Sequence, residues 1–209
     1  MIYQGQNKED QIVSGYFRSK YGQEFKGTVL DLGANDGKTL SNSYHFIDKG
    51  WSATLVEASE ECSKRCSDQH HNNDKVQVLN IGIADRVGKL KFYESGTHLG
   101  GDDIALVSTF DKRELKRWEN NCKFVEKEID VVDYATLLDM STIKSFDFVT
   151  MDIEGVETLV LPQMDLSEVK CLCIEYNMKR DLLLFYTKYA EAAGLKEIHR
   201  NNENVIFGR

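Results

Sequence analysis

Short apolar runs recur along the chain and alternate with segments of helical periodicity. Strands that are separated by crossover helices pair in parallel, and near-continuous apolar strands are typical of a sheet covered on both faces. The pattern therefore predicts an α/β fold with a doubly wound, mostly parallel sheet. The apolar runs cover 27–33, 52–58, 75–84, 146–152 and 170–176, and the helical patterns cover about 39–49, 59–69, 133–141, 155–164 and 179–193.

The end of the chain and one internal segment depart from this alternation. LKEIHRNNENVIFGR, residues 195–209, predicts a hairpin around the turn-rich NNEN, so one of its strands runs antiparallel to the rest of the sheet. Farther upstream, GKLKFYES and KFVEKEIDVV predict strands, and STFDKRELKRWEN predicts a short basic helix with Ser108 or Thr109 as its N-cap. We therefore expect a single domain over 1–209, with an insertion or lid at about 86–130.

Composition narrows the function classes. Hydrophobic residues make up 41% of the 209 residues, enough for a core, while the net charge of −8 disfavours binding to nucleic acid or to anionic membranes. No apolar run approaches the roughly 20 residues of a membrane span, and the polar start MIYQGQNKEDQIV does not resemble a signal peptide. The five cysteines include no CxxC pair, so we expect free thiols and a cytoplasmic location, with Cys171 and Cys173 packed as small hydrophobes in a strand.

The stretch TVLDLGANDGKTLSNSYHF, residues 28–46, predicts a strand, a glycine loop and a helix. Gly33 allows a tight turn, and Gly37 allows close helix packing or the approach of a ligand. In a doubly wound sheet, ligands bind at the carboxyl ends of the strands where the strand order reverses. Glu57 ends the next strand, twenty positions after Gly37, where a carboxylate can accept hydrogen bonds from ribose hydroxyls. The loop and the acid together predict a nucleoside site.

The charge of this loop distinguishes between nucleoside ligands. Asp31 and Asp36 would repel a pyrophosphate, and the spacing G-x-x-x-G differs from the G-x-G-x-x-G of dinucleotide-binding proteins. A cationic nucleoside fits better, since S-adenosylmethionine (SAM) offers a ribose to Glu57, an ammonium group to Asp31 and a sulfonium that tolerates nearby carboxylates. The alternative is a structural turn whose carboxylates are solvated.

Several motifs together resemble one family. The loop DLGANDG, the strand end VEAS, the segment VLNIGIADRVGKLKFYES and the signature FDFVTMDIEGVETLVL are similar to the FkbM family of class I SAM-dependent methyltransferases. The resemblance extends over about residues 4–208, and Gly82 and Ile83 depart from it where the family usually has an alanine. It implies a Rossmann-like, seven-stranded sheet with an antiparallel last strand. It also implies methyl transfer to an oxygen, often of a sugar or a related small-molecule hydroxyl.

We expect the donor SAM to bind at the ends of the first three core strands. Asn80 ends the third of them, near the expected adenine, although asparagine also favours such turns for structural reasons. The expected cofactor-binding residues are Asp31, Gly33, Asn35, Gly37, Glu57, Ala58, Asn80 and Ile81.

The segment MDIEG supplies the candidate catalytic residues at the end of the fourth core strand. Residues i and i+2 of a strand share a face, so the Asp152 and Glu154 carboxylates can both point into the crevice that Gly33 borders. A hydroxyl acceptor must lose its proton to a base or with the help of a metal ion. Asp152 is the first candidate for the base, or for a ligand of a divalent cation, and Glu154 is the second. Either could instead cap the following helix.

Glu175 and Asn177 end the next strand and are candidates for binding the acceptor. Asp152 and Glu175 could also ligate a metal ion together. Mg²⁺ prefers such oxygen ligands, although nothing in the spacing requires it.

Two further segments are candidates for contacts to the acceptor. The basic stretch DKRELKRWEN predicts a solvated helix of mixed charge, or alternatively a lid helix that holds an anionic sugar or nucleotide-sugar. Near the start, GQNKEDQIV could fold over the acceptor with Gln4 and Asp10 directed inward. The basic side chains concerned are Lys112, Arg113, Lys116 and Arg117.

The sequence therefore predicts a SAM-dependent O-methyltransferase of a small, hydroxylated, sugar-like acceptor, without a nucleic-acid or membrane partner. An N-methyltransferase of the same fold is the alternative enzyme, because a neutral amine needs less help from a base than a hydroxyl does. A SAM-binding scaffold without catalytic activity and a dinucleotide-dependent oxidoreductase are the remaining alternatives.

Overall fold

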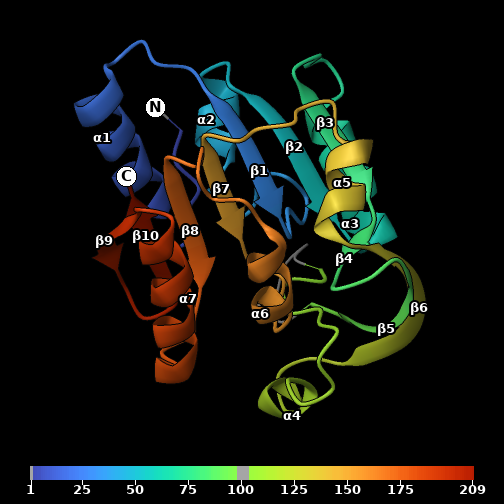
Figure 1. Ribbon diagram of the computed structural model, residues 1–209. Coiled ribbons are helices and arrows are strands. Elements are labelled where there is room, and N and C mark those ends of the chain that lie inside the picture. Colours follow the sequence, from blue (N-terminus) through green and yellow to red (C-terminus); the bar gives the residue numbers. More distant parts are fainter. Residues whose placement is uncertain (1, 98–103) are drawn as a thin grey trace.

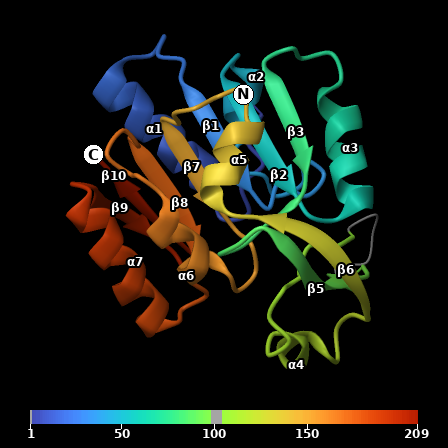
Figure 2. The ribbon, with the colours of Figure 1, turned by 45° about the vertical axis from the view of Figure 1, so that its right-hand side comes forward.

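The structure, a computed structural model that describes residues 2–97 and 104–209, contains a seven-stranded main sheet with helices on both faces (Figure 1). A smaller, three-stranded sheet lies beyond the carboxyl ends of the main-sheet strands (Figure 2). The strands are β1 (Thr28–Leu32), β2 (Ser52–Glu57), β3 (Val76–Asn80), β4 (Gly82–Ile83), β5 (Gly88–Ser95), β6 (Phe124–Val132), β7 (Phe148–Met151), β8 (Cys171–Glu175), β9 (Lys196–Arg200) and β10 (Asn204–Gly208). Their order is β3-β2-β1-β7-β8-β10-β9 in the main sheet and β4-β6-β5 in the smaller one.

The main sheet is parallel except for its last strand. β1 pairs in parallel with β2 and β7, and the pairs β2–β3 and β7–β8 are also parallel. β10 runs antiparallel to both β8 and β9. The predicted doubly wound sheet with an antiparallel last strand is therefore confirmed. Because β2 and β7 lie on opposite sides of β1, the strand order reverses there, at the edge where such folds bind ligands.

Helices cover both faces of the main sheet and divide the core into two apolar clusters. The helices are α1 (Glu9–Tyr21), α2 (Tyr44–Asp48), α3 (Glu60–His70), α4 (Leu115–Trp118), α5 (Tyr134–Met140), α6 (Glu157–Val160), the 3-10 helix η1 (Leu161–Gln163) and α7 (Arg180–Ala192). α1, α2 and α3 contribute to the cluster around Phe17 and Phe148, whereas α5, α6 and α7 contribute to the cluster around Leu137 and Tyr186. No helix among the described residues is long and apolar enough to cross a membrane.

β8 shows why the core strands form continuous apolar runs in the sequence. Leu172 and Ile174 belong to one apolar cluster, and Cys171 and Cys173, which alternate with them, belong to the other. All four side chains are fully buried. The prediction that these two cysteines pack as small hydrophobes is therefore confirmed, and the five cysteines of the chain are free.

The hydrophobic pattern predicts neither α1 nor the late start of α2. In α1 only Val13 and Phe17 are buried apolar residues, a signal too short to separate a helix from a loop. The helix predicted over 39–49 begins at Tyr44. Leu40 has a left-handed φ of 56°, which interrupts a right-handed helix, so the chain forms an irregular loop before α2.

The strand predicted over 75–84 is divided after Asn80. β4 leaves the main sheet and pairs in parallel with β6, and β6 pairs antiparallel with β5 to complete the smaller sheet. This division carries β5, β6 and the described residues between them, which form the predicted insertion, away from the main sheet and over the carboxyl ends of its strands (Figure 2).

The short helix of the insertion starts later than predicted. α4 has Glu114 at its N-cap position, so the prediction that Ser108 or Thr109 caps this helix is wrong. Thr109 instead makes two backbone hydrogen bonds with Tyr93 of β5, at 2.9 and 3.1 Å. The residues between Thr109 and α4 form turns and bends.

Gly33 lies where the loop after β1 meets the loop after β7. Its φ of 88° is in the left-handed region, and its N–H group donates a hydrogen bond to Val56 O at 2.9 Å. A Cβ atom at this position would lie 1.8 Å from the carbonyl oxygen of Asp152. Because that oxygen belongs to the backbone, no side-chain rotation could relieve the clash. Only glycine therefore lets the two loops meet.

Replacing Gly33 with alanine is expected to destabilise the fold by about 1–3 kcal/mol, because the backbone must shift or adopt a strained conformation. Gly15→Ala in α1 is the matched control: no heavy atom lies within 4 Å of its added Cβ atom, and alanine favours a helix interior by about 0.5–1 kcal/mol. Thermal denaturation of the two variants should show a lower melting temperature for the first only. An unchanged melting temperature for Gly33→Ala would contradict the close approach of the two loops.

Candidate active site

A cavity lies at the carboxyl ends of the central strands, between the main sheet and the insertion. Its walls come from the loops after β1, β2, β7 and β8, from the insertion, from the hairpin turn before β10 and from the segment before α1. Most residues that the sequence singles out meet here. They are Asp31, Gly33, Asn35, Glu57, Ala58, Ile81, Asp152, Glu154, Glu175 and Asn177.

Glu57 is fixed at the end of β2 by two backbone N–H groups. Its Oε2 accepts a hydrogen bond from Asn35 N at 2.8 Å, and its Oε1 accepts one from Ser59 N at 2.7 Å. Burial raises the pKa of Glu57 to about 7, although the two N–H groups oppose this shift. Each carboxylate oxygen can still accept a second hydrogen bond. Glu57 therefore offers the cavity two acceptor atoms at set positions.

Asp31 brings the negative charge of the glycine loop into the cavity. It is 5% exposed, and its Oδ2 accepts a hydrogen bond from Ser43 Oγ at 2.6 Å. Burial raises the pKa of Asp31 to about 6, while the hydrogen bond from Ser43 lowers it. Asp36 is not among the described residues that line the cavity, and its Oδ1 accepts hydrogen bonds from Lys38 N and Thr39 N. The predicted repulsion of a pyrophosphate would therefore come from Asp31, and it stays a prediction.

Gly37 and Asn80 are not among the described residues that line the cavity, and they support its walls instead. A Cβ atom on Gly37 would lie 2.7 Å from the sulfur of Cys66, so glycine lets the loop pack against α3. Asn80 Nδ2 donates hydrogen bonds to Glu57 O at 2.9 Å and to Ala58 O at 3.3 Å. Asn80 thus fixes the turn that carries Glu57.

The part of the cavity that Asp31 and Glu57 border is called the donor half, and it fits a cationic nucleoside. Glu57 can accept hydrogen bonds from ribose hydroxyls, and Ile83 and Phe92 give the neighbouring wall an apolar surface for a base. Asn42 also lines the cavity, and its buried Oδ1 has no hydrogen-bond partner among the described residues. Asp31 can accept a hydrogen bond from an ammonium group, whereas the buried Asn42 Oδ1 is out of reach of a ligand in the cavity. Asp31 and Glu57 would hold SAM, whose charge matches theirs.

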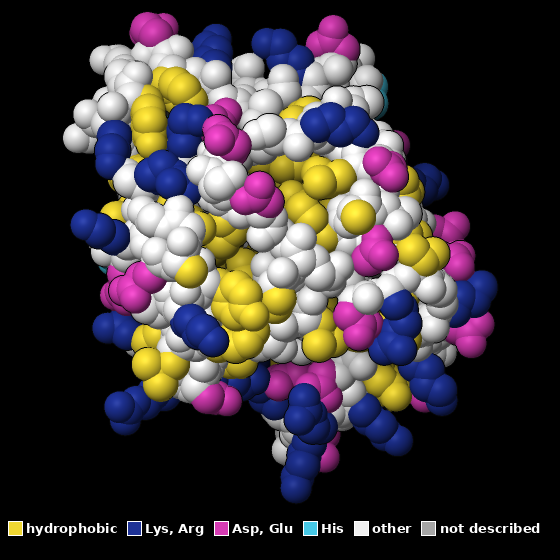
Figure 3. Space-filling view, in the orientation of Figure 1, with side chains coloured by type: hydrophobic (Ala, Val, Ile, Leu, Met, Phe, Trp, Pro, Cys, Tyr) yellow, Lys and Arg dark blue, Asp and Glu magenta, His cyan; other side chains and the backbone are white. Residues whose placement is uncertain are grey.

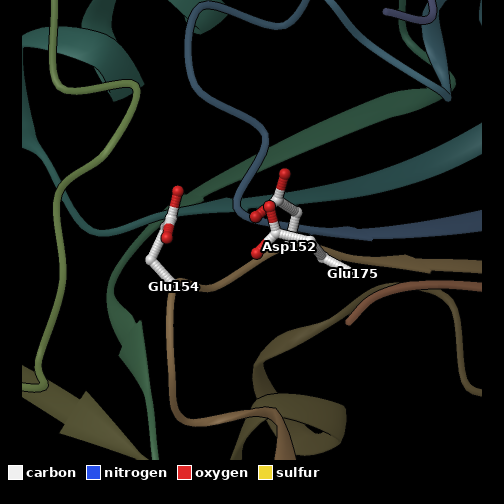
Figure 4. Close-up of side chains that lie close together, drawn as sticks. All are labelled: Asp152, Glu154 and Glu175. Carbon is white, nitrogen blue, oxygen red and sulfur yellow. The ribbon is translucent and has the colours of Figure 1, made fainter. Parts of the chain in front are cut away.

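Three carboxylates face the other half of the cavity, called the acceptor half because the acceptor is expected there. Oxygen atoms of Asp152, Glu154 and Glu175, one from each residue, lie within 4.8 Å of one another. Figure 4 shows Asp152 and Glu175 side by side, and Glu154 beside them on the turn after β7. β7 ends at Met151, so the expected shared strand face is not the reason for this arrangement. Glu154 reaches it through a left-handed backbone, with a φ of 50°.

The three carboxylates disfavour one another's ionisation. Asp152 is accessible from the cavity but surrounded by protein atoms, and lost hydration together with repulsion from nearby carboxylates raises its pKa to about 7. Lost hydration and then repulsion from Asp152 raise the pKa of both Glu154 and Glu175 well above the ordinary value. Arg117 opposes these shifts. A carboxyl group with a pKa of about 7 can take up and release a proton near neutral pH.

Glu157, which is 3% exposed, is a further residue of this turn that was not predicted from the sequence. Its carboxylate accepts hydrogen bonds from Ile153 N at 3.1 Å and from Gly155 N at 3.0 Å. No side chain caps the following helix, so the alternative that Asp152 or Glu154 does so is wrong. The available signal was an acid two residues after the glycine of a strand-to-helix turn, since carboxylates accept hydrogen bonds from such turns.

The start of α1 and the residues before it border the acceptor half through other residues than predicted. Gln6 and Glu9 line the cavity. Asp10 is fully buried, and its Oδ2 accepts hydrogen bonds from Gln4 N at 2.6 Å and from Gly5 N at 3.1 Å. The expectation that Gln4 and Asp10 point toward the acceptor is therefore wrong, because Asp10 fixes the fold of its own segment.

The basic segment contributes Arg117 and Trp118 to the lining of the cavity. Arg117 lines it, forms an ion pair with Glu114 at 3.5 Å and lies 5.0 Å from the ring centre of Trp118. Arg113 pairs with a neighbouring aspartate, and the two lysines are exposed. Figure 3 shows Lys and Arg side chains along the lower edge of the molecule, where α4 lies. The rest of this segment fits the interpretation as a solvated helix of mixed charge, whereas Arg117 and Trp118 line the cavity.

The raised pKa values predict how the stability depends on pH. A carboxyl group whose pKa is higher in the folded protein than in the unfolded chain stabilises the fold fully at low pH. This contribution is lost as the pH rises through the folded-state pKa. For Asp31, Glu57 and Asp152 the loss extends from about pH 4 to about pH 7. The free energy of unfolding of the ligand-free protein is therefore expected to fall between pH 5 and pH 7.

Asp152→Asn removes one of these groups and is expected to reduce the loss. Melting temperatures measured at pH 5, 6, 7 and 8 without ligand should favour the variant over the wild type increasingly as the pH rises. Asp165→Asn is the matched control, because its exposed side chain lies outside the described lining of the cavity. A difference between Asp152→Asn and wild type that does not grow with pH would contradict the crowding of the carboxylates.

Comparison with solved structures shows the same fold in methyltransferases. A candidate RNA methyltransferase from Pyrococcus horikoshii is 13% identical, with 97% of this chain and 84% of the other covered and a TM-score of 0.50. The METTL16 methyltransferase domain is 9% identical, with 94% of this chain and 66% of the other covered and a TM-score of 0.51. No match was found among the curated proteins. At these identities the likeness is one of fold alone.

A family model identifies the chain more closely. The model described as Methyltransferase FkbM domain matches residues 31–194, which include Glu57, the three clustered carboxylates and Glu157. The family and the fold imply SAM as the methyl donor, in agreement with the residues of the donor half. The chain therefore belongs to the FkbM family of methyltransferases.

Proposed function

We propose that this methyltransferase transfers the methyl group of SAM to a hydroxyl oxygen of a small, sugar-like acceptor in the cytoplasm. The observation that carries the proposal is the group formed by Asp152, Glu154 and Glu175, in the same cavity as Asp31 and Glu57. A hydroxyl must lose its proton as it attacks the methyl group, and a carboxylate with a pKa near neutrality is suited to accept it. A base beside a donor site therefore supports O-methylation.

The residues of the cavity have different roles in the proposed reaction. When bound, SAM supplies an electrophilic methyl group on a sulfonium ion. Glu57 would accept hydrogen bonds from its ribose and Asp31 from its ammonium group, so the two residues would hold the donor at two ends. With SAM bound, Asp152 would take the proton of the acceptor hydroxyl as its oxygen attacks the methyl group, and the leaving group would be the neutral thioether S-adenosylhomocysteine (SAH). Because the displacement is in line, correct positioning supplies much of the rate.

The acceptor half has the polar and aromatic groups that a sugar requires. Glu175, Asn177 and Glu203 supply hydrogen-bond acceptors and an amide donor, and Trp118 supplies a flat apolar surface for a sugar ring. Arg117 would bind the phosphate of a nucleotide-linked or otherwise anionic sugar. We therefore propose a sugar hydroxyl as the methylated group, with any negative charge of the acceptor directed toward Arg117.

The same carboxylates also fit a divalent cation. Asp152, Glu154 and Glu175 would give Mg²⁺ three of its oxygen ligands, and the ion would lower the pKa of a bound hydroxyl. Activity that survives treatment with EDTA would assign the proton to Asp152 alone. Activity that EDTA abolishes and Mg²⁺ restores would add the ion to the proposal.

N-methylation is the second candidate, and the charge of the cavity favours it. Asp152, Glu154 and Glu175 would attract a cationic amine, and Arg117 offsets only part of their charge. An amine must lose a proton before it attacks, but once neutral it needs little further help from a base. The two candidates therefore differ in how strongly the reaction depends on Asp152.

Glu57→Gln is expected to weaken the binding of SAH by roughly 10-fold to 100-fold, because the amide replaces a charged acceptor and directs an N–H group at a backbone N–H. Isothermal titration calorimetry with SAH measures the affinity. The matched control is Glu61→Gln on α3, where the exposed side chain pairs with Arg65 at 2.7 Å and no change is expected. Equal affinities of Glu57→Gln and wild type, or thermal stabilisation by NADH but not by SAH, would contradict the donor site.

Asp152→Asn is expected to lower kcat by about 100-fold or more while the affinity for SAH stays nearly unchanged. Transfer of labelled methyl groups from SAM would be measured over a panel of neutral, phosphorylated and nucleotide-linked sugars and of amines. Asp165→Asn again serves as the control with full activity.

The panel also separates the alternatives. Methylation of amines together with a small effect of Asp152→Asn would favour the N-methyltransferase. Binding of SAH without transfer to any compound would favour a scaffold that binds SAM without using it.

A further inference from the structure

The turn after β7 holds Glu154 in a backbone conformation that is unfavourable for residues other than glycine. Glu154 has a φ of 50° and Gly155 a φ of 110°, both in the left-handed region. Outside glycine, such a conformation persists only where surrounding contacts impose it. The contacts that impose it here determine where the Glu154 carboxylate lies.

One of these contacts is Glu157, at the start of α6. Its Oε1 accepts a hydrogen bond from Ile153 N at 3.1 Å, and its Oε2 accepts one from Gly155 N at 3.0 Å. The carboxylate thus binds the N–H groups on both sides of Glu154. Glu157 is 3% exposed and is not among the described residues that line the cavity. Its role is therefore directed at the turn and not at a ligand.

The other contact is Thr109, which belongs to the insertion. Its hydroxyl donates a hydrogen bond to the carbonyl oxygen of Glu154 and accepts one from Asp111 N at 2.9 Å. Thr109 is fully buried, and two backbone hydrogen bonds to Tyr93 fix it to β5. The carbonyl group of Glu154 is therefore held by a segment that lies 45 positions earlier in the chain.

We propose that Glu157 and Thr109 are a pair of positioning residues, which hold the turn through its N–H groups and its carbonyl group and so keep the Glu154 carboxylate beside Asp152 and Glu175. Since Thr109 belongs to the insertion, the insertion sets the geometry of the carboxylates as well as covering the cavity. The inference rests on the proposed function only where it links this geometry to methyl transfer.

The first test measures the turn in the ligand-free protein. Glu157→Ala removes the acceptor of both N–H groups, whereas Glu157→Gln keeps one oxygen that can accept from them. In the alanine variant, amide hydrogen exchange at Ile153 and Gly155, measured by NMR, is expected to be roughly 10-fold faster. A crystal structure of this variant should show the Glu154 carboxylate displaced from Asp152. The glutamine variant should show smaller changes in both measurements.

Thr109 offers a pair of variants that differ by the hydroxyl group alone. Thr109→Val keeps the shape of the side chain and removes the hydroxyl, and it is expected to displace Glu154. Thr109→Ser keeps the hydroxyl and should leave Glu154 in place. Because both contacts act on one turn, the effect of the double variant Glu157→Ala/Thr109→Val on exchange should differ from the sum of the two single effects. Thr109→Val also provides a test if Glu157→Ala does not fold.

The second test measures turnover with SAM and the acceptor that the panel identifies. In Glu157→Ala and Thr109→Val, kcat is expected to fall roughly 10-fold to 100-fold, because a carboxylate misplaced by about 1 Å loses its alignment. The KM for SAM and the affinity for SAH should stay within about twofold, since neither residue belongs to the donor half. The glutamine and serine variants should regain most of the lost kcat.

The outcomes separate this inference from the proposed function. Unchanged amide exchange and an unchanged position of Glu154 would overturn the inference, whichever reaction the enzyme catalyses. A displaced Glu154 with an unchanged kcat would overturn its link to catalysis. If no compound of the panel is methylated, the proposed function fails. The exchange and crystallographic measurements then still decide whether Glu157 and Thr109 hold the turn.

Discussion

The crowding of carboxylates at the ends of parallel strands is the constraint on which the rest of the structure depends. Asp31, Glu57 and Asp152 each lie at or near the carboxyl end of a central strand, and each has a pKa raised to about 6 or 7 because the surrounding protein reduces its hydration. Removing ionised groups from water costs free energy that other parts of the fold must offset. The apolar clusters on both faces of the sheet do so, and so do the backbone N–H groups directed at Glu57.

This cost is also the source of the chemistry. A carboxylate in water has a pKa near 4 and is a poor base at neutral pH, whereas Asp152 is held near the pH at which it would work. A cation in the donor half would lower the electrostatic cost at Asp31 and Glu57. The ligand-free protein therefore carries this cost in full. Destabilised active sites of this kind are common, because selection acts on activity once stability is sufficient.

The predictable part of the site consists of residues at strand ends. A parallel sheet brings the carboxyl ends of its strands to one edge, so Gly33, Glu57 and Asp152 could be placed together without knowledge of any loop. The roles of Thr109 and Glu157 could not be predicted, because both depend on hydrogen bonds to one turn whose left-handed backbone no hydrophobic period encodes. The same limit explains why the loop before α2 was expected to be helical.

The contact between Gly33 and the carbonyl group of Asp152 has a consequence for changing the enzyme by design. The loop that holds the donor and the loop that carries the base touch through their backbones, with no side chain between them to absorb a movement. Substitutions that move the backbone at this contact would thus alter donor affinity and acceptor chemistry together. The hairpin turn at Glu203 and the segment at Gln6 line the cavity at a distance from this contact in the chain. Libraries aimed at new acceptors should therefore diversify those rim positions and leave the two loops intact.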